Sequence, residues 1–223
     1  MIENGAAARR KPSLKLLVLW PAFIILGAEV FHFTSGLPIA FINSSGIEFL
    51  IMVSLFGALA GMIAGVLVGV TQRLLLPAGA PWSKFWIRAT FLGWTVGGSI
   101  YWLLSGASYL AFYKYPKEGL SAGLGIMLGA GVILVAGIII GTIQELFMQR
   151  STEAHNRSWP WLRASAVGWS IGLALWVGLT YVGSEMVGIN YEVFRYLLLP
   201  MGGSSAGIFT ALAMDKLIPT PTT

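Results

Sequence analysis

The fold is decided by residues 65–97, which read GVLVGVTQRLLLPAGAPWSKFWIRATFLGWTVG. This stretch carries the motif G-x3-G-x2-Q, which begins at Gly65, and the motif W-x-R-A-x3-G-W-x2-G, which begins at Trp86. Both motifs recur in the same order, at Gly137 and at Trp161. The offset is 72 residues for the first motif (137 − 65) and 75 for the second (161 − 86), so only the connecting loop differs in length. The pattern indicates an internal duplication.

The composition indicates a chain that lies in a lipid bilayer. Of its 223 residues, 56% are hydrophobic and only 10% are charged, whereas a soluble domain carries about 25% charged residues. A water-soluble core of this size does not bury so much apolar surface, so we expect the bilayer to be the solvent. The chain has no cysteine, which excludes disulfides, thiolate zinc sites and iron–sulfur clusters.

Six apolar stretches are long enough to cross about 30 Å of hydrocarbon as helices. Polar or turn-rich joins separate them, for example Thr34-Ser35-Gly36 and residues 77–81. The first stretch has a basic start, but Trp20-Pro21 and Glu29 lie within it, so we expect a retained helix rather than a cleaved signal peptide. The sequence predicts an all-α membrane protein whose six transmembrane helices lie near residues 14–34, 47–71, 86–110, 120–146, 162–183 and 193–214.

The basic residues give an orientation through the positive-inside rule. With a cytoplasmic N-terminus, eleven Lys and Arg residues lie on the cytoplasmic side and three on the other. This placement explains the net charge of +5 without a nucleic-acid partner. We expect an inner (plasma) membrane protein with both termini cytoplasmic, a basic segment (1–13), a six-helix domain (14–216) and a short tail (217–223). The eleven residues are Arg9, Arg10, Lys11, Lys15, Arg73, Lys84, Arg88, Arg150, Arg157, Arg163 and Lys216, and the three are Lys114, Lys117 and Arg195.

A shorter pattern extends the duplication to three units. The spacing Trp-x6-Gly begins at Trp20, Trp86 and Trp161, always in an odd-numbered predicted helix. The last predicted helix carries Gly203-x3-Gly207-x2-Thr210, with Thr in place of Gln. Units with an even number of helices are parallel repeats, related by an axis along the membrane normal. We expect three tandem two-helix units, at about 14–72, 82–146 and 158–214, arranged around a pseudo-threefold axis.

Glycines on the even-numbered helices are typical of close helix packing. Small residues spaced four apart let helix backbones approach each other in lipid, where no hydrophobic drive brings helices together. Two interpretations stay open: tight packing within the chain, or one glycine face that contacts another subunit. The candidate packing residues are Gly57, Gly61, Gly65, Gly69, Gly137, Gly141, Gly203 and Gly207.

Polar residues at the cytoplasmic helix ends are candidates for contacts with lipid. Gln72 and Gln144 follow the second glycine of their motif, and Arg88 and Arg163 follow a tryptophan that begins the next helix. Arginine reaching toward the interface and tryptophan in the headgroup belt account for such pairs. The glutamines either bond a neighbouring helix end or headgroup, or cap the hairpin. Lipid is a possible ligand, and no cofactor is predicted.

Several acidic residues fall toward the non-cytoplasmic face, namely Glu29, Glu48, Glu118, Glu185 and Glu192. Glu29 and His32 are three residues apart and share a helix face. A carboxylate inside a membrane span is a functional hypothesis by default, so Glu29, His32 and Glu48 are a candidate proton or cation site at the outer mouth. The alternative is that they lie at the water boundary. Neutral imidazole also ligates metals, but a single histidine in a span does not predict haem or chlorin binding.

The sequence carries no motif of a known catalytic class. A Walker loop and a metal-hydrolase motif such as HExxH are absent. His32 and His155 lie near opposite faces of the predicted bundle, so no Ser/His/Asp arrangement can form. No metal site and no enzyme is predicted.

At the two duplicated motifs, the chain resembles a group of uncharacterised multi-pass membrane proteins of bacteria. Their helices repeat GxxxGxxQ, followed by a helix start with tryptophan and arginine. The resemblance covers residues 57–100 and 129–176 and implies no site residue, because the motifs define the repeat rather than a reaction.

Three classes of function remain. The first is a non-catalytic integral subunit of a larger membrane complex, of respiratory or photosynthetic type, that packs through its glycine-rich faces; we expect this class. The alternative is a small transporter or channel, as a monomer or homo-oligomer, with Glu29, His32 and Glu48 at an outer entry. A lipid-modifying enzyme is the third, for which the sequence offers no nucleophile or metal set.

Overall fold

The computed structural model describes residues 14–39, 46–76, 81–111, 122–151, 159–188 and 198–217. All regular elements in these ranges are helical. The long helices are α1 (Leu14–Ile39), α2 (Ile47–Arg73), α3 (Trp86–Tyr109), α4 (Ala122–Ser151), α5 (Trp159–Tyr181) and α7 (Leu198–Leu217), with the 3-10 turn η1 (Pro81–Phe85) before α3 and the π-helical turn η3 (Val182–Met186) after α5. Several features of the sequence analysis lie outside these ranges: the predicted basic segment (1–13), the predicted tail beyond Leu217, and the residues Glu118, His155 and Glu192.

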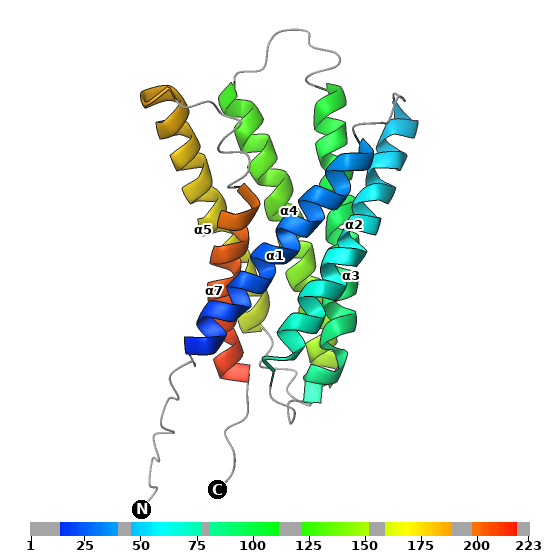
Figure 1. Ribbon diagram of the computed structural model, residues 1–223, viewed down its shortest axis with the longest axis vertical. Coiled ribbons are helices and arrows are strands. Elements are labelled where there is room, and N and C mark those ends of the chain that lie inside the picture. Colours follow the sequence, from blue (N-terminus) through cyan, green and yellow to red (C-terminus); the bar gives the residue numbers. More distant parts are fainter. Residues whose placement is uncertain are drawn as a thin grey trace, which may run out of the picture.

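The long helices form a closed ring. Each packs mainly against its neighbours in chain order, and α1 also packs against α7, which closes the ring. The first turn of α1 and the last turn of α7 lie at the same end of the bundle, and the helices diverge toward the opposite end (Figure 1). The protein is therefore an all-α bundle in which the first and last helices are neighbours.

The helices agree with the predicted apolar stretches to within about three residues, except that α1 and α4 end later than predicted, at Ile39 and Ser151. The predicted start of the last stretch, at residue 193, lies outside the described ranges. Residues Thr34-Ser35-Gly36 were expected to be a join, but α1 continues through them to Ile39. The hydroxyls of Thr34 and Ser35 each donate to a carbonyl four residues earlier, at Val30 and Phe31, over 2.6 Å. A hydroxyl that bonds back within its own helix needs no partner from a turn, and so the helix does not end there.

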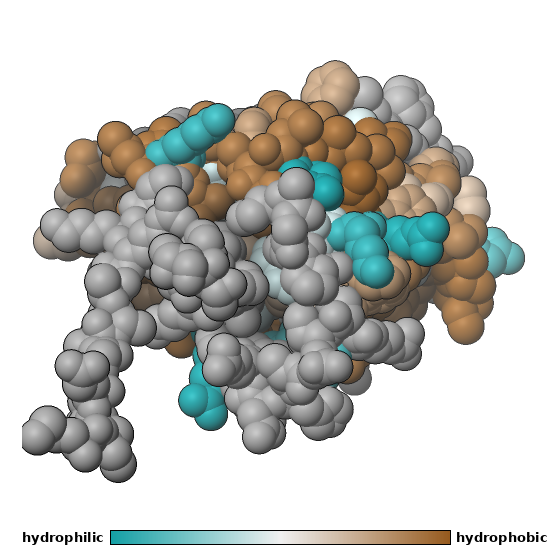
Figure 2. Space-filling model, turned by 90° about the horizontal axis from the view of Figure 1, so that it is seen from below, coloured by the Kyte–Doolittle hydropathy of each residue, from teal (hydrophilic) through white to brown (hydrophobic). Residues whose placement is uncertain are grey.

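The exterior of the bundle is apolar. Among the described residues, four helices are long and apolar enough to cross a membrane: Leu14–Ser35, Ile47–Arg73, Met127–Gln149 and Trp161–Thr180. Leucine, isoleucine and valine side chains are exposed along them, for example Leu55, Ile63 and Leu175. Figure 2, from the end at which α1 begins and α7 ends, shows hydrophobic side chains over much of the flank of the molecule. The chain is thus a multi-pass membrane protein.

The glycines of α2 face α3 over the full length of the contact. A Cβ on Gly57 or Gly61 would overlap the backbone carbonyl of Gly98 or Trp94, and one on Gly65 would lie 2.9 Å from Cα of Phe91. Real Cβ atoms do not approach backbone so closely. The absence of a side chain therefore lets the two helices meet backbone to backbone, as interhelical packing in lipid requires.

Glycines at corresponding places on α4 and α7 also face the next helix of the ring. Added Cβ atoms on Gly137 and Gly141 would meet Trp169 and Ser165 of α5, and on Gly203 and Gly207 they would meet Ile24 and Pro21 of α1. Gly69, the last glycine of α2, faces Ile87 of α3. All eight predicted packing glycines thus contact another helix of the same chain.

Candidate functional site

Three tryptophans from three different helices meet at the centre of the ring. The ring centroids of Trp20 and Trp86 are 5.4 Å apart, those of Trp86 and Trp161 are 5.2 Å apart, and those of Trp20 and Trp161 are 6.1 Å apart. Each side chain is at most 1% exposed. Trp86 and Trp161 therefore do not face lipid headgroups as the sequence suggested, because their indoles pack on one another inside the bundle.

Each of these indoles donates a hydrogen bond to the helix that precedes its own around the ring. Trp86 Nε1 donates to Gln72 Oε1 over 3.1 Å, Trp161 Nε1 donates to Gln144 Oε1 over 3.2 Å, and Trp20 Nε1 donates to Thr210 Oγ1 over 3.2 Å. We refer to these six residues as the indole–amide layer. A buried indole N–H needs an acceptor, and the layer supplies one for each.

Both glutamines lie inside the bundle rather than at the lipid surface. Gln72 is 1% exposed and Gln144 is 7% exposed, so a headgroup does not reach them. Gln144 Nε2 also donates to Thr90 Oγ1 over 3.2 Å. The predicted headgroup contact is therefore corrected for both: their amides join helices, since a buried amide must find its partners within the protein.

Arg88 and Arg163 are exposed, at the ends of their helices where the sequence placed them. Lys84 lies nearby in η1, with its ammonium 5.0 Å from the centre of the Phe85 ring. Contact of this basic group with anionic headgroups stays a prediction.

A buried carboxyl group beside Gln144 was missed by the sequence reasoning. Glu145 on α4 is 6% exposed; its Oε2 accepts the backbone N–H of Leu162, in the first turn of α5, over 2.8 Å, and its Oε1 accepts from Gln149 Nε2 over 3.0 Å. A carboxylate near a helix N-terminus interacts favourably with the helix dipole. The sequence did contain a signal for this contact, because Glu145 directly follows Gln144, the glutamine of the repeated motif. A charged residue at the end of an apolar span needs a partner.

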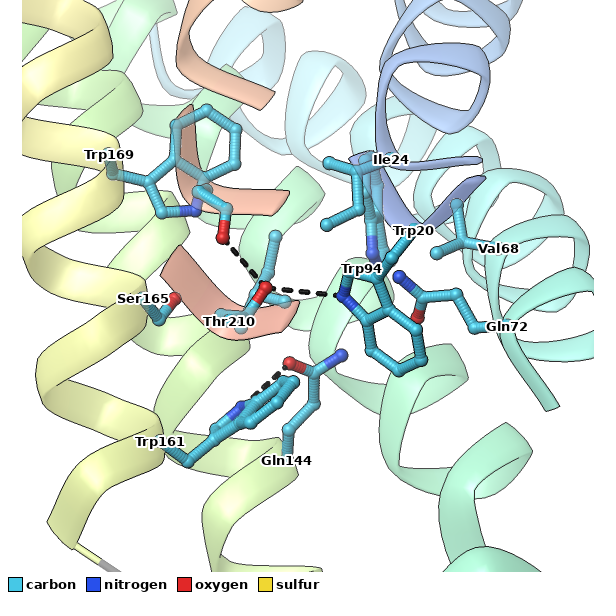
Figure 3. Close-up of a pocket in the computed structure, with 12 residues that line it drawn as sticks. Trp20, Ile24, Val68, Gln72, Trp94, Gln144, Trp161, Ser165, Trp169 and Thr210 are labelled. Carbon is cyan, nitrogen blue, oxygen red and sulfur yellow. Dashed lines mark hydrogen bonds between the residues drawn. The ribbon is translucent and has the colours of Figure 1, made fainter. Parts of the chain in front are cut away.

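A small cavity lies beside the indole–amide layer. Its volume is about 30 Å³, and its lining combines indole rings with four polar side chains, those of Gln72, Gln144, Ser165 and Thr210 (Figure 3). The aliphatic part of the lining is formed by Ile24, Val68, Ile140 and Ala206. The cavity is large enough for a water molecule and far too small for an organic substrate.

The residues of the predicted outer site are Glu29, His32 and Glu48, on α1 and α2. Glu29 and Glu48 are exposed and His32 is half-buried. In the described ranges, no three His, Asp or Glu side chains are close enough to hold a metal ion together. The side chain of Glu185 and the residues Glu118 and Glu192 lie outside the part of the chain that the structure describes. Among the described residues, Glu29, His32 and Glu48 therefore do not form a metal-ion site together, and a role for them in proton binding stays a prediction.

The six residues of the indole–amide layer interact through hydrogen bonds between neutral groups. The indole–amide layer contains indoles, amides and a hydroxyl, none of which is a nucleophile activated by a neighbouring base.

Comparisons with protein-family models, with curated proteins and with solved structures found no match.

Proposed function

We propose that the chain consists of three tandem two-helix units, α1–α2, α3–α4 and α5–α7, each of which crosses the bacterial inner membrane twice. The support is one type of hydrogen bond that repeats around the ring of helices. In each unit, an indole N–H of the first helix donates to the second helix of the unit before it, and α1 donates to α7. In each case the donor begins a Trp-x6-Gly spacing, and the acceptor lies three residues after a motif glycine. On this proposal all six long helices are transmembrane and both termini are cytoplasmic.

We further propose that the protein is a non-catalytic integral subunit of a larger membrane assembly. The observation that carries this proposal is the filled centre of the ring. Three buried indoles and their acceptors occupy it, and the cavity beside them measures only about 30 Å³. A solute path needs polar groups along a passage, whereas the polar groups of the indole–amide layer hydrogen-bond to one another.

The partner surface in this proposal differs from the one that the sequence suggested. The predicted glycine faces contact helices of the same chain, so a partner must use another face. Ser170, Ala174 and Gly178 are exposed at four-residue spacing along α5, and a Cβ on Gly178 would meet no atom within 4 Å. Small outward residues at this spacing allow close approach of a helix in lipid, so this face is the one to test.

The test is purification from native membranes in mild detergent. On this proposal the protein comigrates with other integral membrane polypeptides, and Ala174→Leu weakens that comigration. Ala22→Leu is the matched control, because Ala22 is an exposed alanine on α1. A folded Ala174→Leu variant that retains its partners would remove α5 from the interface.

The same preparation distinguishes the alternative function. A lone monomer or homo-oligomer that moves a solute into liposomes would overturn the subunit proposal in favour of a transporter. Glu29→Gln would then identify whether the outer carboxyl group takes part. A lone species without transport would also overturn the proposal, because it requires a partner.

A further inference from the structure

Three contacts between helices repeat around the ring, and one of them joins helices that are not consecutive in the chain. They are the α2–α3, α4–α5 and α7–α1 interfaces, each with one bond of the indole–amide layer. Residues 74–85 link α2 to α3, and residues 152–158 link α4 to α5. The helices α7 and α1 lie far apart in the chain, so no short link ties one to the other. Only noncovalent contacts hold the α7–α1 interface together.

The two linked interfaces each carry a second bond outside the indole–amide layer. Between α2 and α3, the hydroxyl oxygens of Ser54 and Ser99 are 2.7 Å apart, at hydrogen-bond distance. Between α4 and α5, Glu145 Oε2 accepts the backbone N–H of Leu162 over 2.8 Å. Separation of either interface therefore breaks at least two hydrogen bonds across it, and each of these bonds opposes the separation.

The α7–α1 interface carries one side-chain hydrogen bond among the described residues, from Trp20 Nε1 to Thr210 Oγ1. Thr210 stands where α2 and α4 have glutamine. Its hydroxyl also donates to the carbonyl of Ala206, 2.7 Å away in the same helix, and a hydroxyl has a single hydrogen to donate. Thr210 therefore offers α1 an acceptor and no donor, so separation of this interface breaks fewer bonds than separation of the other two.

A proline in α1 lies at the same interface. A Cβ added to Gly207 would lie 2.5 Å from Cα of Pro21, so the two helices touch there. Proline has no N–H, and the carbonyl of Leu17, four residues earlier, therefore lacks its helical donor. A helix that misses such a bond bends at that point more readily than a regular helix. Pro21 thus gives α1 a point at which its first turns can tilt away from α7.

We propose that the ring opens at the α7–α1 interface, where the first turns of α1 (residues 14–20) tilt away from the last turns of α7. Both sets of turns lie at the same end of the bundle (Figure 1). The movement breaks the bond between Trp20 and Thr210 and leaves the α2–α3 and α4–α5 interfaces closed. It exposes the three central indoles to the bilayer, whereas each is at most 1% exposed in the closed ring. The inference rests on the helix contacts and does not depend on the proposed subunit role.

A cysteine at the proposed opening reports on this movement, because the chain has no other thiol. Ala211 is 0% exposed and lies four residues after Gly207, on the helix face that meets α1. It belongs to the same buried cluster as Leu16 and Trp20 of α1. A thiol at this position reacts when the interface opens, so its reaction rate measures the population of the open state. Ala213→Cys, in the same cluster, is the second probe should Ala211→Cys not fold.

Ala89→Cys is the matched control on α3. Ala89 is 1% exposed and lies four residues before Gly93, which faces Ile140 of α4. It is therefore similarly buried, but at a contact that the proposed movement leaves closed. With N-ethylmaleimide and the full chain in liposomes, we expect Ala211→Cys to react at least about tenfold faster than Ala89→Cys. Equal rates, or a faster reaction of Ala89→Cys, would overturn the proposal.

Thr210→Val tests whether the bond with Trp20 holds the interface closed. Valine is similar to threonine in shape but has no acceptor. We expect this substitution to raise the reaction rate of the Ala211→Cys protein by about two- to tenfold and to leave that of the Ala89→Cys protein unchanged. Equal increases in both proteins would indicate global loosening, and no increase in either would exclude this bond as the closure. Both results contradict the proposal.

Discussion

At the scale of single residues, the centre of the bundle depends on side chains that satisfy one another. Gln144 makes two side-chain hydrogen bonds, with Trp161 and Thr90, whereas Gln72 makes one, with Trp86. All of these groups are buried. Removing one partner leaves the other without a bond, and that loss exceeds the net contribution of a satisfied bond. The two glutamines therefore contribute differently to the free energy of unfolding, although they occupy the same position of the motif.

We predict that Gln144→Leu destabilises the protein more than Gln72→Leu. Leucine removes the acceptor of Trp161 and the donor to Thr90 in the first case, and only the acceptor of Trp86 in the second. The expected loss is about 1–3 kcal/mol for each buried group left without a partner. Equilibrium unfolding in mixed micelles, followed by tryptophan fluorescence, measures the difference. Equal losses for the two variants would contradict the assignment of the second bond.

Glu145 provides a second test at this scale. Glu145→Gln keeps an acceptor for the Leu162 N–H but removes the charge near the start of α5, and we expect a loss of about 1 kcal/mol. Glu145→Leu removes the acceptor as well and is expected to cost more. Glu29→Gln, at an exposed position on α1, serves as the control. A Glu145→Leu variant with the unfolding curve of the wild type would exclude a structural role for this carboxyl group.

At the scale of elements, two helices pack backbone to backbone where one of them has glycine at the contact. Gly61 lies against the backbone carbonyl of Trp94, whereas Gly131, on the exposed side of α4, has no atom within 4 Å of an added Cβ. The two glycines therefore do different things in helices of similar composition. One allows two backbones to meet, and the other only lowers the helix propensity of its segment.

This difference predicts opposite effects of the same substitution. Gly61→Ala forces α2 and α3 apart and should destabilise the protein by about 1–3 kcal/mol, as overpacking does. Gly131→Ala meets open space and should be neutral or stabilise the helix by up to about 1 kcal/mol. Melting temperatures in the same detergent compare the two variants directly. A Gly61→Ala protein at least as stable as the wild type would refute the close α2–α3 contact.

At the scale of the whole molecule, the closed ring predicts which helix ends share a side of the membrane. Lys84 in η1 and Arg163 at the start of α5 are exposed, as are Glu48 at the start of α2 and Val187 after η3. With six spans and a cytoplasmic N-terminus, the first two positions are cytoplasmic and the last two are external.

Single cysteines test this layout without any background substitution, because the chain has none. We expect a membrane-impermeant thiol reagent, applied to intact spheroplasts, to label Glu48→Cys and Val187→Cys. Lys84→Cys and Arg163→Cys should react only after the membrane is opened. Labelling of Lys84→Cys and Arg163→Cys from opposite sides would break the three-unit layout and the six-span count together.

The sequence by itself was sufficient for the class of the fold and for most helix bounds. Hydropathy and length act on each segment separately, since every span must satisfy its own backbone in lipid. The starts of α2 and α3, at Ile47 and Trp86, lie where the apolar stretches were placed. The end of α1 differs, because the hydroxyls of Thr34 and Ser35 bond within the helix, a local choice that composition does not reveal.

Which side of each helix faces inward was decided only by the tertiary structure. In water the apolar stripe of a helix identifies its buried face, but in lipid the outside is as apolar as the core. The spacing therefore predicted that Trp86 and Gln72 match Trp161 and Gln144. Their positions at helix ends, however, suggested contact with lipid headgroups. The ring of helices brings them to its centre, because indole N–H and amide groups removed from water are stable only when they bond each other.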